Sequence, residues 1–196
     1  MGMIDPPDVL PPPLLLAITY APPAIRSRLR WLLEFDLNLR TVLDRTKEPM
    51  IVQLRLAWWR DALKTEASKR PNGAPILAAL ATLEPDTALI NAALVLTDAI
   101  EVLGCDPEPA ERDAAKVQRI QALCDAYRVW VEGDENDGRK IAAAWVHSSA
   151  AMPKSLNRKW RPLSILMLAE HLDNGTAPDS ALSPGLRLNW HALTGR

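Results

Sequence analysis

Two carboxylate residues, Asp98 and Glu101, lie three positions apart in a stretch whose apolar residues recur at helical spacing. Side chains at this spacing share one face of a helix, so the pair can act together on one ligand. Carboxylate oxygens suit a hard cation such as Mg²⁺. The same spacing is also common at solvated helix edges and in ion pairs between helices, and the sequence leaves these structural interpretations open.

A dense basic patch precedes the last long predicted helix and contains Trp160; its members are Lys154, Arg158, Lys159 and Arg161. Such a patch can meet a diphosphate, an anionic lipid head group or an acidic protein partner. It is also typical of a solvated loop next to a helix start. The patch is therefore a candidate site for an anionic group.

Residue types that often mark metal or nucleophilic sites are not spaced for that chemistry. His147, His171 and His191 lack ligand spacing, and Cys105 and Cys124 are too far apart for a CxxC site. Glycine-rich phosphate loops and the GxSxG motif are absent. We therefore assign no catalytic residue and no metal ligand, and we expect no cofactor.

The residues expected to line a groove lie on a helix with two adjacent tryptophans. Trp59 continues one apolar row of this helix and Trp58 continues a second. Two adjoining rows predict burial over a broad arc, with both tryptophans in the core. Asp61 is then expected to pair with a basic side chain of another helix. The candidate groove residues are Arg55, Trp58, Trp59, Arg60, Asp61, Asp98 and Glu101.

Proline and glycine divide the chain into helical segments. Proline stands before or at the start of most of the segments with helical periodicity, where its missing N–H is tolerated. Gly104 is expected to end one helix in the left-handed conformation, and residues 133–138 are expected to form a turn. No convincing alternating strand pattern is present. The sequence predicts an all-α, single-domain helical bundle over residues 14–196, preceded by a Pro-rich arm of residues 1–13.

Composition narrows the function classes. The chain has 196 residues, 48% hydrophobic content and a net charge of −1. A nearly neutral chain of this kind argues against broad nucleic-acid binding, which needs a basic surface. We find no signal peptide and no apolar run long enough to cross a bilayer, although peripheral membrane contact is compatible with the sequence. A cytoplasmic location is expected, and the oligomeric state stays open.

The tryptophan segment also carries a family resemblance. Glu48 and Pro49 followed by RLAWWRDAL at residues 55–63 resemble the squalene/phytoene synthase family, particularly the bacterial and mitochondrial branch with an EP…RLxWWRDAL signature. Residues 16–22, 161–166 and 193–196 resemble the opening and closing segments of such proteins. The resemblance implies a bundle of isoprenoid-synthase type.

The resemblance also implies a chemistry whose two aspartate-rich motifs we do not find in this chain. Active members hold Mg²⁺ on two aspartate-rich motifs and condense two prenyl diphosphates head to head. The first motif is expected near Leu39, Arg40 and Thr41, where Arg40 would repel Mg²⁺. The second has only one candidate, the predicted turn of residues 133–139.

The sequence therefore leaves open whether the chain is an enzyme. Our first interpretation is a diverged relative without metal-dependent prenyl transfer, which binds a lipid or isoprenoid or a protein partner, as assembly factors for respiratory complex I in the mitochondrial branch do. The alternative is an active transferase of isoprenoid biosynthesis that condenses farnesyl or geranylgeranyl diphosphate, with Asp98, Glu101 or Asp134 as Mg²⁺ ligands.

Overall fold

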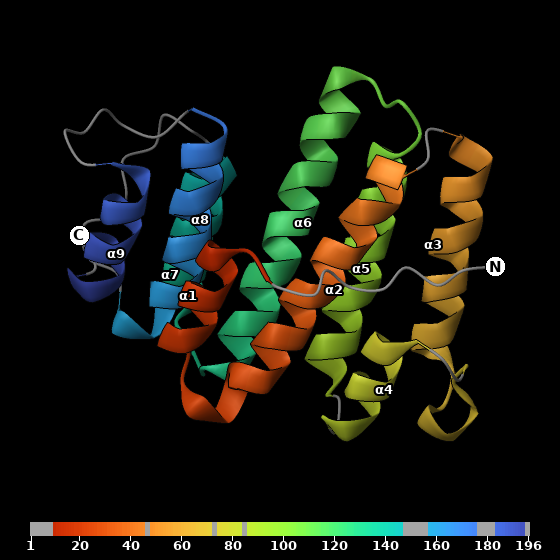
Figure 1. The fold of residues 1–196 in the computed structure, drawn as a ribbon, viewed down its shortest axis with the longest axis horizontal. Helices are drawn as coiled ribbons and strands as arrows, with labels where there is room; N and C mark the ends of the chain where they lie inside the picture. The colour runs from red at the N-terminus through yellow and green to blue at the C-terminus, as the bar shows by residue number, and fades with distance from the viewer. Residues whose placement is uncertain are drawn as a thin grey trace. The chain divides into compact units, whose positions relative to one another are not determined.

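Proline starts several of the helices in the computed structural model, as the sequence predicted. The structure describes residues 10–45, 48–71, 74–83, 86–146, 157–175 and 183–194. Within these ranges the chain forms nine α-helices, three short 3₁₀ helices and no strand (Figure 1). Pro12, Pro49, Pro75 and Pro162 each lie in the first two positions of a helix. The all-α prediction is confirmed.

The α-helices are α1 Pro12–Tyr20, α2 Arg26–Arg45, α3 Pro49–Lys64, α4 Pro75–Thr82, α5 Thr87–Leu103, α6 Pro109–Trp130, α7 Glu135–Val146, α8 Arg161–Asp173 and α9 Pro184–Thr194. The 3₁₀ helices are η1 Pro23–Ile25, η2 Ala67–Lys69 and η3 Arg158–Trp160. Helix α1 begins inside the arm predicted for residues 1–13, and residues 1–9 lie outside the described ranges.

The chain forms two compact units. The described residues of the first, here the central unit, lie within residues 30–126, and those of the second, here the terminal unit, lie within residues 10–29 and 127–194. In the central unit α3 packs against α5. In the terminal unit α8 contacts α1, α7 and α9, and α1 also contacts α9.

An aromatic cluster from α2 and α3 fills the core of the central unit. The rings of Trp31 and Phe35 stack with centroids 5.1 Å apart, and Trp59 meets Phe35 edge-on at 5.5 Å. The indole nitrogen of Trp31 donates a hydrogen bond of 2.7 Å to the carbonyl oxygen of Ile76 in α4. Aromatic pairs of this geometry stabilise beyond simple burial, so the cluster fixes α3 at its tryptophan.

Gly104 follows α5 but does not adopt the expected left-handed conformation. Gly104 ends α5 as predicted, but its φ is −85°, so the predicted left-handed conformation is wrong. A Cβ atom at this position would lie 2.6 Å from Val52 Cγ1 and 2.8 Å from Leu43 Cδ2. Glycine is needed here because the backbone approaches the side chains of α2 and α3 too closely for any side chain.

The predicted turn at residues 133–138 is also only partly correct. Helix α7 begins at Glu135, so Gly138 is a helical residue. A Cβ atom at Gly133 would lie 2.7 Å from Cζ2 of Trp160, and one at Gly138 would lie 3.0 Å from its Cη2. The two glycines make room for this buried indole rather than mark one turn.

Candidate functional site

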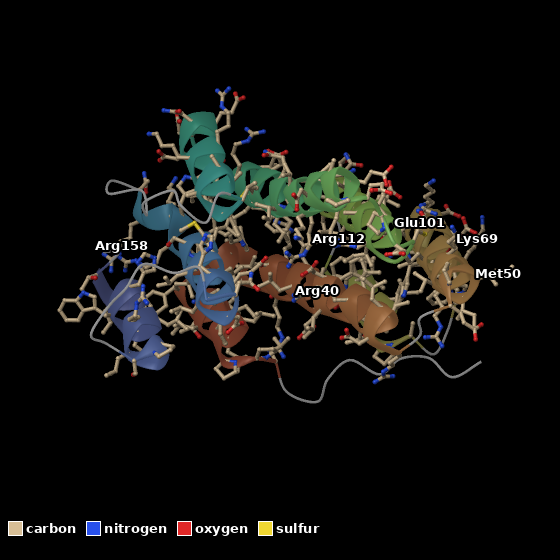
Figure 2. All side chains as sticks on the ribbon, turned by 90° about the horizontal axis from the view of Figure 1, so that it is seen from above. Arg40, Met50, Lys69, Glu101, Arg112 and Arg158 are labelled. Carbon is tan, nitrogen blue, oxygen red and sulfur yellow. The ribbon has the colours of Figure 1, made fainter. Side chains whose placement is uncertain are left out.

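Helix α3 has two apolar faces, and only one of them is buried. Val52, Leu56, Trp59 and Leu63 face the core, as residues at helical spacing do. Met50, Leu54 and Trp58 form an outer row on the opposite side, with 74%, 59% and 36% of their surfaces exposed. Figure 2 shows the side chain of Met50 pointing away from α3.

The expectation that both adjacent tryptophans are buried is therefore wrong for Trp58. Trp59 is 4% exposed, whereas Trp58 extends past it with the two ring centroids 4.8 Å apart and the rings nearly perpendicular. Neighbouring helix positions point about 100° apart, and the core covers one side of α3 rather than a broad arc. Trp58 consequently belongs to the outer row.

Arg60 of α3 binds both carboxylates that the sequence marked as a pair. Its Nε donates to Asp98 Oδ1 at 2.9 Å, and its Nη2 donates to Glu101 Oε2. Burial disfavours the charged guanidinium, but the hydrogen bonds to Glu101 and Asp98 outweigh it and raise the pKa of Arg60. Figure 2 places Glu101 on the same side of the central unit as Lys69. The pair is thus an ion-pair partner of α3, one of the alternatives left open by the sequence.

The other two charged residues of the α3 segment differ from Arg60. Asp61 is exposed, and no side-chain ion pair to it occurs within the described ranges, so the expected partner on another helix is not found. The reason is geometric, because Asp61 continues the outer row beyond Leu54. Arg55 is half-buried, and its Nη1 has no hydrogen-bond partner among the described residues.

A buried ion pair that the sequence analysis missed lies between α2 and α6. Asp36 accepts hydrogen bonds of 2.8 and 2.7 Å from Nε and Nη2 of Arg119, and Arg40 Nε lies 3.4 Å from the same carboxylate. Burial disfavours the charged carboxylate, but the Arg119 charge and hydrogen bonds outweigh it and lower the pKa of Asp36. The available signal was two opposite charges on the apolar faces of two predicted helices.

The expected first aspartate-rich position coincides with this cluster. Leu39 is fully buried, and the hydroxyl of Thr41 donates to the carbonyl oxygen of Asn38 at 2.7 Å. Arg40 adds a second positive charge beside Asp36. The region therefore carries more positive than negative charge where a Mg²⁺ site would need the reverse.

The basic patch is only partly described. Lys154 and His147 lie outside the described ranges. Arg158 and Lys159 are exposed on η3, and the Lys159 ammonium donates to the carbonyl oxygen of Val131 at 3.2 Å. Arg161 is half-buried, with its guanidinium carbon 5.8 Å from the centroid of the Tyr20 ring. The patch thus consists of side chains with separate roles.

The comparisons with known proteins identify the domain that contains α3. The family model described as squalene/phytoene synthase matches residues 13–102. This part of the chain is similar to the squalene/phytoene synthase family. The matched range includes Arg60 and its two acidic partners. No curated protein and no solved structure matches the sequence.

The described residues of this squalene/phytoene synthase-like region do not fit the Mg²⁺ cluster that the family resemblance implies. Asp98 and Glu101 are both bound by Arg60, and Asp36 is enclosed by Arg119 and Arg40. Among the described residues no group of three or more acidic, histidine or cysteine side chains is placed to hold a metal ion. We therefore derive no metal-dependent step for this chain.

The second candidate motif has a different environment from the one expected. Asp137 lies in the first turn of α7, with its carboxylate 3.6 Å from the Lys140 ammonium. Asp134 precedes the helix and accepts a hydrogen bond of 2.8 Å from the backbone N–H of Asn136. Both carboxylates thus have local structural roles at the start of α7.

In the described ranges, no helix of the squalene/phytoene synthase-like chain is long and apolar enough to span a bilayer.

Proposed function

We propose that this squalene/phytoene synthase domain binds an apolar ligand, a lipid or isoprenoid, or acts as an assembly-factor-type interaction protein, without metal-dependent prenyl transfer. The observation that carries the proposal is the ion pair of Arg60 with Asp98 and Glu101. A carboxylate held by a guanidinium must lose that partner before it can bind Mg²⁺. We propose that this role needs no cofactor and takes place in the cytoplasm. The proposal leaves the oligomeric state open.

Two features of α3 support the binding role. The helix presents the apolar outer row of Met50, Leu54 and Trp58, which other described residues leave exposed. Arg55 lies on a flank of the same helix, where a polar end of a ligand meets positive charge, whereas the charge of Arg60 is already neutralised by Asp98 and Glu101. Exposed apolar surface rimmed by polar groups is common at binding sites.

The alternative, an active prenyl transferase, draws on one observation. Asp137 projects from a helix rather than from a turn, as a catalytic carboxylate of this family is expected to do. Its contact with Lys140 weighs against this alternative, as does the lack, among the described residues, of a group of three or more side chains that could hold a metal ion.

Two measurements separate these functions. The first follows pyrophosphate release from farnesyl diphosphate in the presence of Mg²⁺, for which we expect no signal above the protein-free reaction. Turnover that Asp98→Asn abolishes and Asp113→Asn leaves intact would support the transferase. Asp113 is a suitable control because it forms an exposed pair with Lys116 at 3.5 Å on α6.

The second measurement follows tryptophan fluorescence during titration with geranylgeraniol, an isoprenoid without a diphosphate. We expect saturable binding that does not need Mg²⁺. Trp58→Ala should weaken this binding by about tenfold, since the ring supplies apolar contact area. Val117→Ser, a change of an exposed apolar residue on α6, should have no effect. Equal loss in both variants would contradict a specific site at α3.

A further inference from the structure

Helix α9 presents an apolar stripe that no described residue covers. Leu186, Trp190 and Leu193 recur at positions i, i+4 and i+7, so they lie on one face of the helix. Their surfaces are 59%, 58% and 67% exposed. The opposite face of α9 is buried, and it carries Ala192 and His191 against α8.

The contact between α8 and α9 fixes the orientation of this stripe. His191 Nε2 lies 2.9 Å from the hydroxyl oxygen of Ser164, and both side chains are buried. Ser164 is in the first turn of α8, directly after η3. The C-terminal half of α9, with Trp190 and Leu193, therefore lies near η3, while the outer stripe faces away from α8.

Arginines flank the stripe at both ends. Arg187 is on α9 itself, about 100° around the helix from Leu186. Figure 2 shows Arg158 of η3 beside the dark-blue ribbon of α9. Neither guanidinium forms an ion pair with any residue that the structure describes. The described residues thus leave both charges without an acidic partner.

Among the residues that the structure describes, acidic side chains are separated from this surface. Residues 157–169 and 183–194 contain no Asp or Glu. Glu170 is about 9 Å further along α8 than Ser164, at the usual helical rise. Glu132 and Asp134 lie on the loop between α6 and α7, and this loop contacts Lys159 and Trp160 of η3. Because Lys159 is close to these acidic residues, we do not count it as part of the surface. The surface that remains is apolar and cationic.

From this juxtaposition we propose that α9 and Arg158 dock the terminal unit on an anionic lipid surface. Leu186, Trp190 and Leu193 enter the head-group region, where indole rings are favoured. Arg158 and Arg187 bind lipid phosphate oxygens. This inference goes beyond the proposed function, because it concerns a different unit and a different helix.

The area of the stripe favours a membrane over a protein partner. Three side chains present on the order of a few hundred Å², below the ~800 Å² per partner of a stable protein complex. A bilayer needs no such complementary surface, because each apolar side chain partitions on its own. The outer row of α3 does not share the charge pattern, since Arg60 is neutralised and Asp61 lies in line with that row.

The test is co-sedimentation of the full chain with vesicles of two compositions. One set contains phosphatidylcholine alone, and the other contains equimolar phosphatidylcholine and phosphatidylglycerol. We expect binding to the anionic vesicles only, weakened by added salt because screening shortens the reach of the arginine charges. Equal binding to both sets, or binding to neither, would overturn the proposal.

Matched variants locate the contact. Trp190→Ser should weaken binding to anionic vesicles by about tenfold or more, and Arg158→Gln by about fivefold. The controls are Val129→Ser, an apolar residue that is 51% exposed in the same unit, and Arg139→Gln, an exposed arginine of α7. Neither control should change binding. Circular dichroism verifies that each variant keeps its helical content.

Sedimentation velocity in the absence of lipid distinguishes docking on lipid from self-association of the chain through the stripe. The parent chain and Trp190→Ser should sediment identically. A shift to a smaller species on Trp190→Ser would show that the stripe binds a second copy of the chain and would overturn docking on lipid.

Discussion

Asp36 and Arg119, 83 positions apart in sequence, form a two-pronged ion pair that joins α2 to α6 inside the central unit. Only 2% of the Asp36 side chain and 10% of the Arg119 side chain are exposed. Charges this deeply buried are tolerated only when they are paired. The pair is therefore a buried polar contact that holds α6 to α2 in this unit.

Removing one partner should strongly destabilise the chain. Asp36→Asn leaves the Arg119 guanidinium buried without a counter-charge, which costs about 3–5 kcal/mol when a buried pair is broken. Urea denaturation measures the change in unfolding free energy. The control is Glu34→Gln, which removes an exposed ion pair with Arg30 and should cost about 0.5 kcal/mol. Similar losses in both variants would contradict the special role of the buried pair.

The same ion pair should make stability depend on acidic pH. The pKa of Asp36 is lowered from its ordinary value of 3.8, although burial alone would raise it, because Arg119 and then Arg40 favour the ionised form. A lowered pKa in the folded state contributes stability above the unfolded value, and that contribution is lost as pH falls through the folded value. Thermal unfolding between pH 7 and pH 2 should show a steeper acid loss for the parent than for Asp36→Asn.

The two adjacent tryptophans should differ in their contributions to stability. Trp59→Ala removes a core side chain and should cost about 3–5 kcal/mol. Trp58→Ala removes a partly exposed ring and should cost about 1–2 kcal/mol, mainly through lost contact with its neighbour. Denaturant midpoints of the two variants test this order, and a reversed order would mean that α3 buries its other face.

The two cysteines should react with thiol reagents at very different rates. Burial, and then the Asp125 charge, raise the pKa of Cys124 from 9.0 to about 12, whereas Cys105 is exposed. The thiolate is the reactive form, so at pH 8 a rise from 9.0 to about 12 lowers its population by roughly three orders of magnitude. Iodoacetamide followed by mass spectrometry should label Cys105 alone in the native chain and both cysteines in denaturant.

Two glycine-to-alanine changes should have opposite effects. In Gly104→Ala the new methyl group would collide with Val52 and Leu43, so we expect a loss of about 1–3 kcal/mol from overpacking. Gly185 in α9 has no atom within 4 Å of the new Cβ position, so Gly185→Ala should gain up to about 1 kcal/mol in helix propensity. Melting temperatures shifted in the same direction would contradict this account.

The helices were predictable from the sequence because their signals are local. Proline in a first turn and apolar residues at helical spacing depend only on neighbours along the chain, as for α3 and α8. Their contacts were not predictable to the same extent. Arg60 gave no indication that its partners were Asp98 and Glu101, since the choice depends on how α3 packs against α5.

The errors share one physical origin, which is tertiary packing. Trp58 was expected in the core because its row is apolar, but the central unit covers only the opposite side of α3. Gly104 was expected to adopt a left-handed conformation, but glycine is needed there because side chains of α2 and α3 lie too close to its backbone for a Cβ atom. A single sequence contains the apolar pattern of a helix and not the identity of the neighbour that will cover it.

The perpendicular contact between Trp58 and Trp59 gives the chain an optical reporter of its own. With ring centroids 4.8 Å apart, the two indole chromophores are close enough to exchange excitation energy. Trp59 lies in the core, whereas Trp58 is partly exposed at the surface of α3. A quencher that contacts only Trp58 should therefore also reduce the fluorescence emission of Trp59. The coupled transitions of the two rings should also give a near-ultraviolet circular dichroism signal, and this signal should disappear in Trp58→Phe.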